Sequence, residues 1–232
     1  MSKVSAIDFG ERIQSLEGKP LVLGSEGKAR RRELLDAIAF LHLSGVLTNG
    51  RSANASVRLN DTPDHILVSA RGLPKDIGED DFGVVTLDGE FVSGRLGKGV
   101  RSVIAMHTHA YKRPNVGSVI HTHSLNATAF AVARQPIPPH YEPLLTRGQK
   151  IPVPVSPYGA RNTDGTSGLV SQLDGFLAEH PETRSVLLAN HGLLVFDETP
   201  EKTAQLAVTI DEAAGIFIRA ASIGGAQPIS QS

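Results

Sequence analysis

Apolar residues recur at helical spacing in several long segments of the chain, and each segment is expected to pack one face on a core. In the first, Leu34, Leu35, Ile38 and Leu41 follow a basic run and form one amphipathic stripe. Helices are predicted on the same grounds for residues 28–44, 101–112, 124–135, 168–183 and 200–223. Ser124 or Asn126 is expected to cap the third of these helices.

Shorter apolar runs, broken by turn residues, predict strands between the helices. Residues 52–77 alternate small, apolar and polar side chains and are interrupted by Asn, Pro and Gly, which indicates two short strands joined by a turn. Residues 82–94 contain two further runs separated by Asp88-Gly89, a two-residue hairpin signal. Together these segments predict an antiparallel meander.

Two more apolar runs predict buried strands in the second half of the chain. Residues 116–124 form a short strand that ends in a histidine-rich segment, and ligands tend to collect at such strand ends in α/β proteins. Residues 185–197 form a second strand, interrupted by Asn190-His191-Gly192. Gly192 permits a close backbone approach or an unusual dihedral angle at this point.

The mixture of helices and strands predicts an α/β fold in one domain. The chain has 232 residues, of which 40% are hydrophobic, and this is enough for a substantial core. No repeat or long linker divides it, so residues 1–232 are expected to form a single domain. About 25 N-terminal and about 10 C-terminal residues are expected to be peripheral.

Charge and composition exclude several classes of function. The formal net charge is −1, which gives no global field that favours nucleic acid or an anionic membrane. The chain has no cysteine, so a metal would be held by nitrogen and oxygen ligands. No apolar run approaches the roughly 20 residues that cross a bilayer. We therefore expect a cytoplasmic protein that binds a small molecule.

Three histidines form a candidate metal site. In an extended strand His121 and His123 point to the same face, where both imidazoles can converge on one ion. The alternative for this pair is a solvent-facing strand end. His191 lies in an apolar segment, where an unpaired imidazole would be costly, and it supplies a third ligand. Three imidazoles leave coordination positions open, as in catalytic sites, and accept zinc, manganese, iron or cobalt.

The segments around these histidines resemble the class II aldolase/adducin family. The similar motifs are "SVIHTHSLNATAFAV" and "LLANHGLLVFDETPEKTAQLAVTIDEAA", and the resemblance extends from Leu34 to Ala214. It implies a three-layer α/β/α sandwich with a mainly antiparallel central sheet, and one divalent ion held by His121, His123 and His191. It also implies a homotetramer with active sites at the subunit interfaces.

The chain departs from the family at the expected general base. Family aldolases carry Ser-Ser-Glu at the start of the helix before the histidine pair, where this chain has Arg101, Ser102 and Val103. A valine neither accepts a proton nor binds a metal, so proton abstraction beside a carbonyl loses its expected base. His107 and His109, further along the same helix, are candidate replacements; the alternative for each is a packed or exposed helix residue.

The expected substrate pocket also differs. The family holds a phosphate with Gly-Asn, Thr-Gly or Ser-Gly, and the two serines, whereas this chain places arginines at two of these positions. Guanidinium groups suit carboxylates as well as phosphates, which predicts a small anionic carboxylate as substrate. The alternative is that the arginines are solvated. The predicted substrate-binding residues are Asn54, Arg71, Gly72, Arg101 and Ser102.

Tyr141, in "PPHYEP", matches a family tyrosine that reaches across the subunit boundary and donates a proton. Simple packing beside the Pro-rich loop is the alternative. His140 and Glu142 flank this tyrosine and are further acid or base candidates.

These features favour a metal-dependent, non-oxidative decarboxylase. The resemblance includes family members that act on hydroxylated aromatic or heteroaromatic dicarboxylates, such as 3,4-dihydroxyphthalate, in the degradation of aromatic compounds. Decarboxylation needs an electron sink rather than a carboxylate base. The alternative is an aldolase, an epimerase or a sugar-acid phosphate decarboxylase with a relocated base. A non-catalytic, adducin-like module is disfavoured because all three histidines are present.

Overall fold

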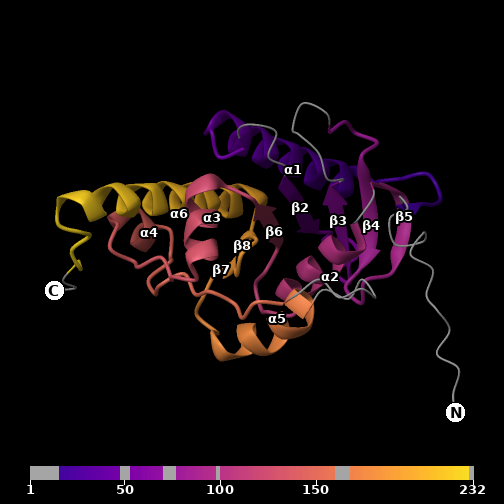
Figure 1. The fold of residues 1–232 in the computed structure, drawn as a ribbon. Coiled ribbons are helices and arrows are strands. Elements are labelled where there is room, and N and C mark those ends of the chain that lie inside the picture. Colours follow the sequence, from indigo (N-terminus) through magenta and orange to yellow (C-terminus); the bar gives the residue numbers. More distant parts are fainter. Residues whose placement is uncertain (1–15, 48–52, 70–76, 98–99, 160–167, 230–232) are drawn as a thin grey trace, which may run out of the picture.

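A central sheet flanked by helices on both faces organises the chain (Figure 1). The computed structural model describes residues 16–47, 53–69, 77–97, 100–159 and 168–229. All eight strands of the sheet pair antiparallel, in the order β1-β5-β4-β3-β2-β6-β8-β7. The predicted α/β sandwich with a mainly antiparallel sheet is therefore confirmed.

The strands from β2 to β6 follow the predicted pattern. Strands β2 to β5 form the antiparallel meander, and Gly89 has a positive φ of 90° in the turn between β4 and β5. Strand β6 is central and joins this meander to the last two strands. The bounds are β1 Leu16–Glu17, β2 Ala53–Arg58, β3 His65–Ser69, β4 Phe82–Thr86, β5 Phe91–Leu96, β6 Ser118–Thr122, β7 Ser185–Leu188 and β8 Gly192–Asp197.

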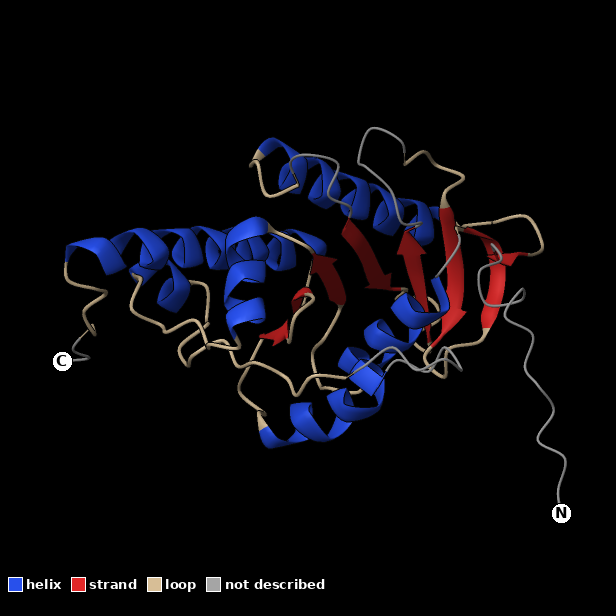
Figure 2. Ribbon diagram, in the orientation of Figure 1, coloured by secondary structure: helices blue, strands red, loops and turns tan. Residues whose placement is uncertain are grey.

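Figure 2 shows α1, α3 and α6 on one face of the sheet, and α2 and α5 on the other. The predicted long helices are present, and the short β1 and α4 are elements that the sequence pattern did not indicate. The helices are α1 Ser25–Leu43, α2 Val100–Tyr111, α3 Leu125–Ala133, α4 Glu142–Thr146, α5 Gly168–Glu179 and α6 Pro200–Ala220, followed by a short 3-10 turn at Ala221–Ile223.

Strand β2 buries apolar side chains on one face and polar side chains on the other. Ala53, Ala55 and Val57 are buried in the apolar cluster beneath α1 and α6. Because side chains alternate along a strand, Asn54 and Ser56 point to the opposite face, toward α2. Both polar residues are also buried, so α2 covers a polar cluster within an otherwise apolar layer.

The segment 185–197 differs from the prediction of one interrupted strand. It is a tight hairpin, in which β7 pairs with β8 in a register that joins Leu188 to Gly192. Asn190 adopts a left-handed conformation with φ of 58°, which asparagine tolerates better than most residues. The reversal puts His191 in the turn of the hairpin, at the same edge of the sheet as the end of β6.

The predicted capping of α3 is also different. Ser124 occupies the N-cap position, but its side chain makes no capping hydrogen bond. Instead, Asp211 of α6 accepts hydrogen bonds from the backbone N–H of Ala127 (2.8 Å) and from Nδ2 of Asn126 (3.1 Å). A buried carboxylate from another helix therefore fixes the first turn of α3, just after the histidine pair. Its negative charge also interacts favourably with the positive end of the α3 dipole.

Within the described ranges, no helix is both long and apolar enough to cross a membrane.

Candidate metal centre

The three predicted ligands converge. Nε2 of His121 lies 2.9 Å from Nε2 of His123, and Nε2 of His123 lies 3.4 Å from Nε2 of His191. All three ligand atoms lie within 4.8 Å of one another. His121 is buried, whereas His123 and His191 are half-buried, so the cluster opens to one side.

A backbone contact fixes the orientation of the innermost ligand. Nδ1–H of His121 donates a hydrogen bond to the carbonyl oxygen of Leu193, at 2.9 Å. In a neutral imidazole this leaves a lone pair on Nε2, which faces the other two rings. Burial, and then the nearby His123 and His191, hold the pKa of His121 well below its usual value, so the ring stays neutral. Neutral nitrogen donors at this separation fit a divalent ion of the zinc or cobalt type.

Gly192 is required for this convergence. A Cβ atom at this position would lie 2.5 Å from the carbonyl oxygen of Thr122, 2.9 Å from Cδ2 of His123 and 3.1 Å from Cε1 of His121. Such contacts are shorter than van der Waals distances, and one of them involves backbone that cannot move aside. The close approach expected at Gly192 is therefore confirmed, and its reason is the space that the two imidazoles occupy.

His107 belongs to a buried hydrogen-bonded network beside the cluster. Its Nδ1 lies 2.7 Å from Oγ of Ser56, and its Nε2 lies 2.6 Å from Oδ1 of Asn54. Oγ of Ser56 also lies 2.9 Å from the hydroxyl of Tyr111. His107 is fully buried, and burial lowers its pKa to about 3. Both ring nitrogens are engaged, which favours an orienting role for His107 over the predicted role as acid or base.

Val103 stands in the apolar layer, at the position where the family resemblance places a glutamate. It is 8% exposed and packs in the cluster that α2 forms with the sheet. Arg101 and Ser102 precede it on the first turn of α2 and are exposed. The predicted substrate residues Arg71 and Gly72 lie outside the described residues. Of the predicted pocket, the structure thus brings Asn54 next to the histidines.

Two further acid or base candidates, His109 and Tyr141, have partners of their own. Nδ1 of His109 donates to the carbonyl oxygen of Ala105, and its Nε2 lies 3.9 Å from Oδ2 of Asp174 on α5. Tyr141 hydrogen-bonds with Glu212 of α6, and its pKa is raised by burial and then by this carboxylate. His109 thus lies at the contact between α2 and α5, and Tyr141 lies against α6.

Sequence reasoning missed Ser56, the Leu193 carbonyl and Asp211 as supports of the site. A signal existed for the first of them, because Ser56 lies two residues from Asn54 in a strand and so shares its face. His107 and Tyr111 are four residues apart and share a helix face in the same way. The partners from distant elements, Leu193 and Asp211, left no local signal.

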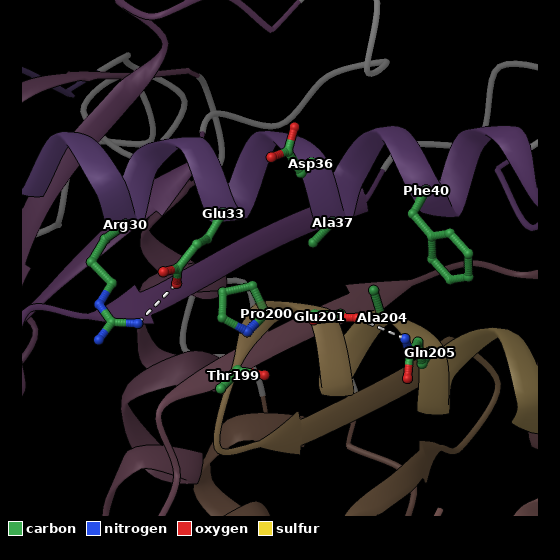
Figure 3. A pocket seen from close by; sticks show the side chains of 10 residues that line it. All are labelled: Arg30, Glu33, Asp36, Ala37, Phe40, Thr199, Pro200, Glu201, Ala204 and Gln205. Carbon is green, nitrogen blue, oxygen red and sulfur yellow. Dashed lines mark hydrogen bonds and ion pairs between the residues drawn. The ribbon is translucent and has the colours of Figure 1, made fainter.

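A separate groove of about 550 Å³ lies between α1 and α6 (Figure 3). Ala37 and Phe40 of α1 face Pro200 and Ala204 of α6 across it, and charged side chains line its rim. It begins beside the residues that follow the C-terminal end of β8, whereas the histidines lie at the N-terminal end of that strand. The groove is therefore distinct from the metal centre.

The fold and the site together define the protein as a metal-site α/β domain of the class II aldolase type. Residues 32–218 match the class II aldolase and adducin N-terminal domain. The chain belongs to this family.

Several relatives give the likeness more detail. One relative is the 5-methylthioribulose-1-phosphate/5-deoxyribulose-1-phosphate aldolase of Rhodospirillum rubrum, to which the chain is 31% identical over 197 residues. This alignment covers 84% of the present chain and 83% of the relative. The chain is 28% identical over 181 residues, covering 73% of it and 83% of the relative, to the methylthioribulose-1-phosphate dehydratase of Hahella chejuensis. A solved L-fuculose 1-phosphate aldolase superposes with a TM-score of 0.75, at 25% identity over 90% of this chain and 94% of that one.

These relatives are aldolases and a dehydratase of sugar phosphates, and none of them is an aromatic decarboxylase. They support the family resemblance, whereas the finer resemblance to its aromatic decarboxylases finds no support in them. The comparison favours the aldolase alternative over the decarboxylase hypothesis.

Proposed function

We propose that the protein is a divalent-metal-dependent carbon–carbon lyase whose substrate is a small phosphorylated ketose. The observation that carries this proposal is the convergence of three imidazole Nε2 atoms within 4.8 Å of one another. A ketose 1-phosphate has adjacent carbonyl and hydroxyl oxygens that can occupy the open positions of such an ion. The sugar-phosphate aldolases among the relatives act on substrates of this kind.

The residues of this chain divide the work around the ion. His121, His123 and His191 would hold it, and a bound divalent ion would supply Lewis acidity that stabilises a developing enolate. Asn54 would donate hydrogen bonds to the substrate, and its partner across the sheet is His121. Val103 moves no proton, so both proton transfers of an aldol cleavage need another group. We propose that Tyr141, reaching the centre of a neighbouring subunit in a homotetramer, donates its phenolic proton to the enolate carbon. The proton released by the cleaved hydroxyl group then returns to the phenolate, which restores the phenol.

Decarboxylation of a hydroxylated aromatic or heteroaromatic dicarboxylate is the second candidate. Val103 is the specific observation that favours it, because loss of CO2 needs an electron sink and a proton donor but no carboxylate base. In this reaction the three histidines would hold the same ion, and the arginines at positions 71 and 101 would bind the second carboxylate. The two candidates share the metal centre and differ in what leaves the substrate.

One experiment separates them. The protein is loaded in turn with Zn²⁺, Mn²⁺ and Co²⁺ and incubated with 5-deoxyribulose 1-phosphate, L-fuculose 1-phosphate and 3,4-dihydroxyphthalate. Release of dihydroxyacetone phosphate, followed by a coupled dehydrogenase assay, supports the aldolase proposal, whereas release of CO2 supports the decarboxylase. His191→Ala serves as the control and should abolish either reaction. Turnover that survives in this variant, or a purified protein that binds no stoichiometric divalent ion, refutes a metal-dependent lyase of either kind.

A further inference from the structure

In the buried network under α2, the donor and the acceptor of each hydrogen bond can be assigned from the chemistry of its atoms. Oδ1 of Asn54 can only accept, so Nε2 of His107 carries the proton in their 2.6 Å hydrogen bond. A neutral imidazole protonated at Nε2 has a bare Nδ1, which accepts from the hydroxyl of Ser56 at 2.7 Å. Ser56 has then used its only proton, so the hydroxyl of Tyr111 donates to it at 2.9 Å. Tyr111, Ser56, His107 and Asn54 thus form one directed chain of donors.

The burial of this chain keeps its direction fixed. His107 and Ser56 are fully buried, and Tyr111 is 3% exposed. Burial lowers the pKa of His107 to about 3 and raises that of Tyr111 above its usual value, so the imidazole stays neutral and the phenol keeps its proton. Reversing the hydrogen bonds would point two donors at each other or leave a buried donor without an acceptor, which is costly in a low-dielectric interior.

The end of the chain of donors faces the metal centre. Asn54 pairs directly with His121 across β2 and β6, and both side chains lie on the α2 face of the sheet. Because Oδ1 is held by His107, the amide nitrogen is the group of Asn54 that can still bond elsewhere. Within the part of the chain that the structure describes, this nitrogen has no hydrogen-bond partner. It is also not one of the atoms that are buried without a partner, so solvent or a ligand can reach it. Two N–H donors therefore remain available beside His121.

We propose that His107 is a positioning residue, which Ser56 and Tyr111 hold so that the amide N–H groups of Asn54 face an oxygen of a ligand bound to the metal. In this arrangement Asn54 touches the ligand, whereas His107 acts only through Asn54. The ligand chemistry that fits is an anionic or strongly polarised oxygen, since the amide presents donors alone. This inference rests on the metal site of the proposed function but not on the reaction that occurs there.

The test uses Co²⁺-loaded protein and glycolate, whose hydroxyl and carboxylate oxygens chelate a divalent ion. The dissociation constant is measured from the change in the visible absorption of the cobalt. Asn54→Ala is expected to weaken glycolate binding about tenfold, because a hydrogen bond to a charged oxygen is lost. Ser56→Ala and Tyr111→Phe are expected to weaken it about threefold, and neither should add to the effect in the Asn54→Ala background.

Thr108→Val is the matched control, because the buried hydroxyl of Thr108 on α2 bonds, among the described residues, only to the carbonyl of Ala105 in its own helix. It should lower the melting temperature without changing glycolate binding. The proposal is overturned if Ser56→Ala and Tyr111→Phe behave like this control, or if their effects persist undiminished without Asn54. Cobalt content, measured in every variant, separates a lost ligand contact from a lost metal. Because no turnover is involved, the result stands whichever reaction the protein catalyses.

Discussion

Replacing Gly192 by alanine should disable the metal centre while leaving most of the fold in place. The added Cβ would meet the carbonyl oxygen of Thr122 at 2.5 Å and Cδ2 of His123 at 2.9 Å. The carbonyl belongs to β6, which β2 and β8 hold on both sides, so its contact is relieved by a shift of the turn that carries His191. The remaining contacts are relieved by displacing the imidazoles of His121 and His123. Overpacking of this kind costs about 1–3 kcal/mol. If the displaced ligands carry this cost, the metal affinity falls by about 5- to 150-fold, since each 1.4 kcal/mol is tenfold.

The assay is competition between the protein and a chromophoric chelator for Zn²⁺, with urea unfolding to report the stability of the metal-free protein. Gly175→Ala is the matched control, because a Cβ at this position of α5 has no atom within 4 Å. It should leave the metal affinity unchanged and stabilise the helix by about 0.5–1 kcal/mol. Zinc affinity in Gly192→Ala within twofold of the wild type would show that the glycine does not hold the ligands in place.

Further predictions concern stability and assembly. The neutral form of His107 is buried, with a pKa lowered from 6.5 to about 3, so the unfolded chain binds a proton that the folded protein excludes. The contribution of His107 to the free energy of unfolding is therefore fully present above pH 6.5 and is lost as the pH falls toward 3, by about 2 kcal/mol between pH 7 and pH 5. Urea titrations at the two pH values should find a smaller loss in His107→Phe. Asp211→Ala removes the cap of α3 and should cost about 1–2 kcal/mol in urea unfolding, whereas Glu179→Ala, at an exposed position of α5, should cause no loss. Light scattering of the purified protein should give the mass of a homotetramer, and a monomer at micromolar concentration would contradict the role proposed for Tyr141.

The sequence alone determined much about this protein, because local periodicity records which face of an element is buried. The apolar stripe of α1, the Asp88-Gly89 turn and the alternation around His121 and His123 each carry their signal within a few residues. Such patterns fix the type of an element and the face that it buries. They were sufficient for the mixture of helices and strands and for the antiparallel meander, whereas the three-layer sandwich and the set of three candidate metal ligands came from the family resemblance.

The tertiary structure decided how the parts of the site act on one another. The β7–β8 hairpin, and not a straight strand, returns His191 to the end of β6. The carbonyl of Leu193 sets the tautomer of His121, and Asp211 caps a helix 84 residues away from it in the sequence. His107 matched the family pattern, yet its role depends on Ser56, and only the packing of α2 on β2 brings the two side chains together. These contacts join distant segments, and a linear pattern carries no record of which distant atoms will meet.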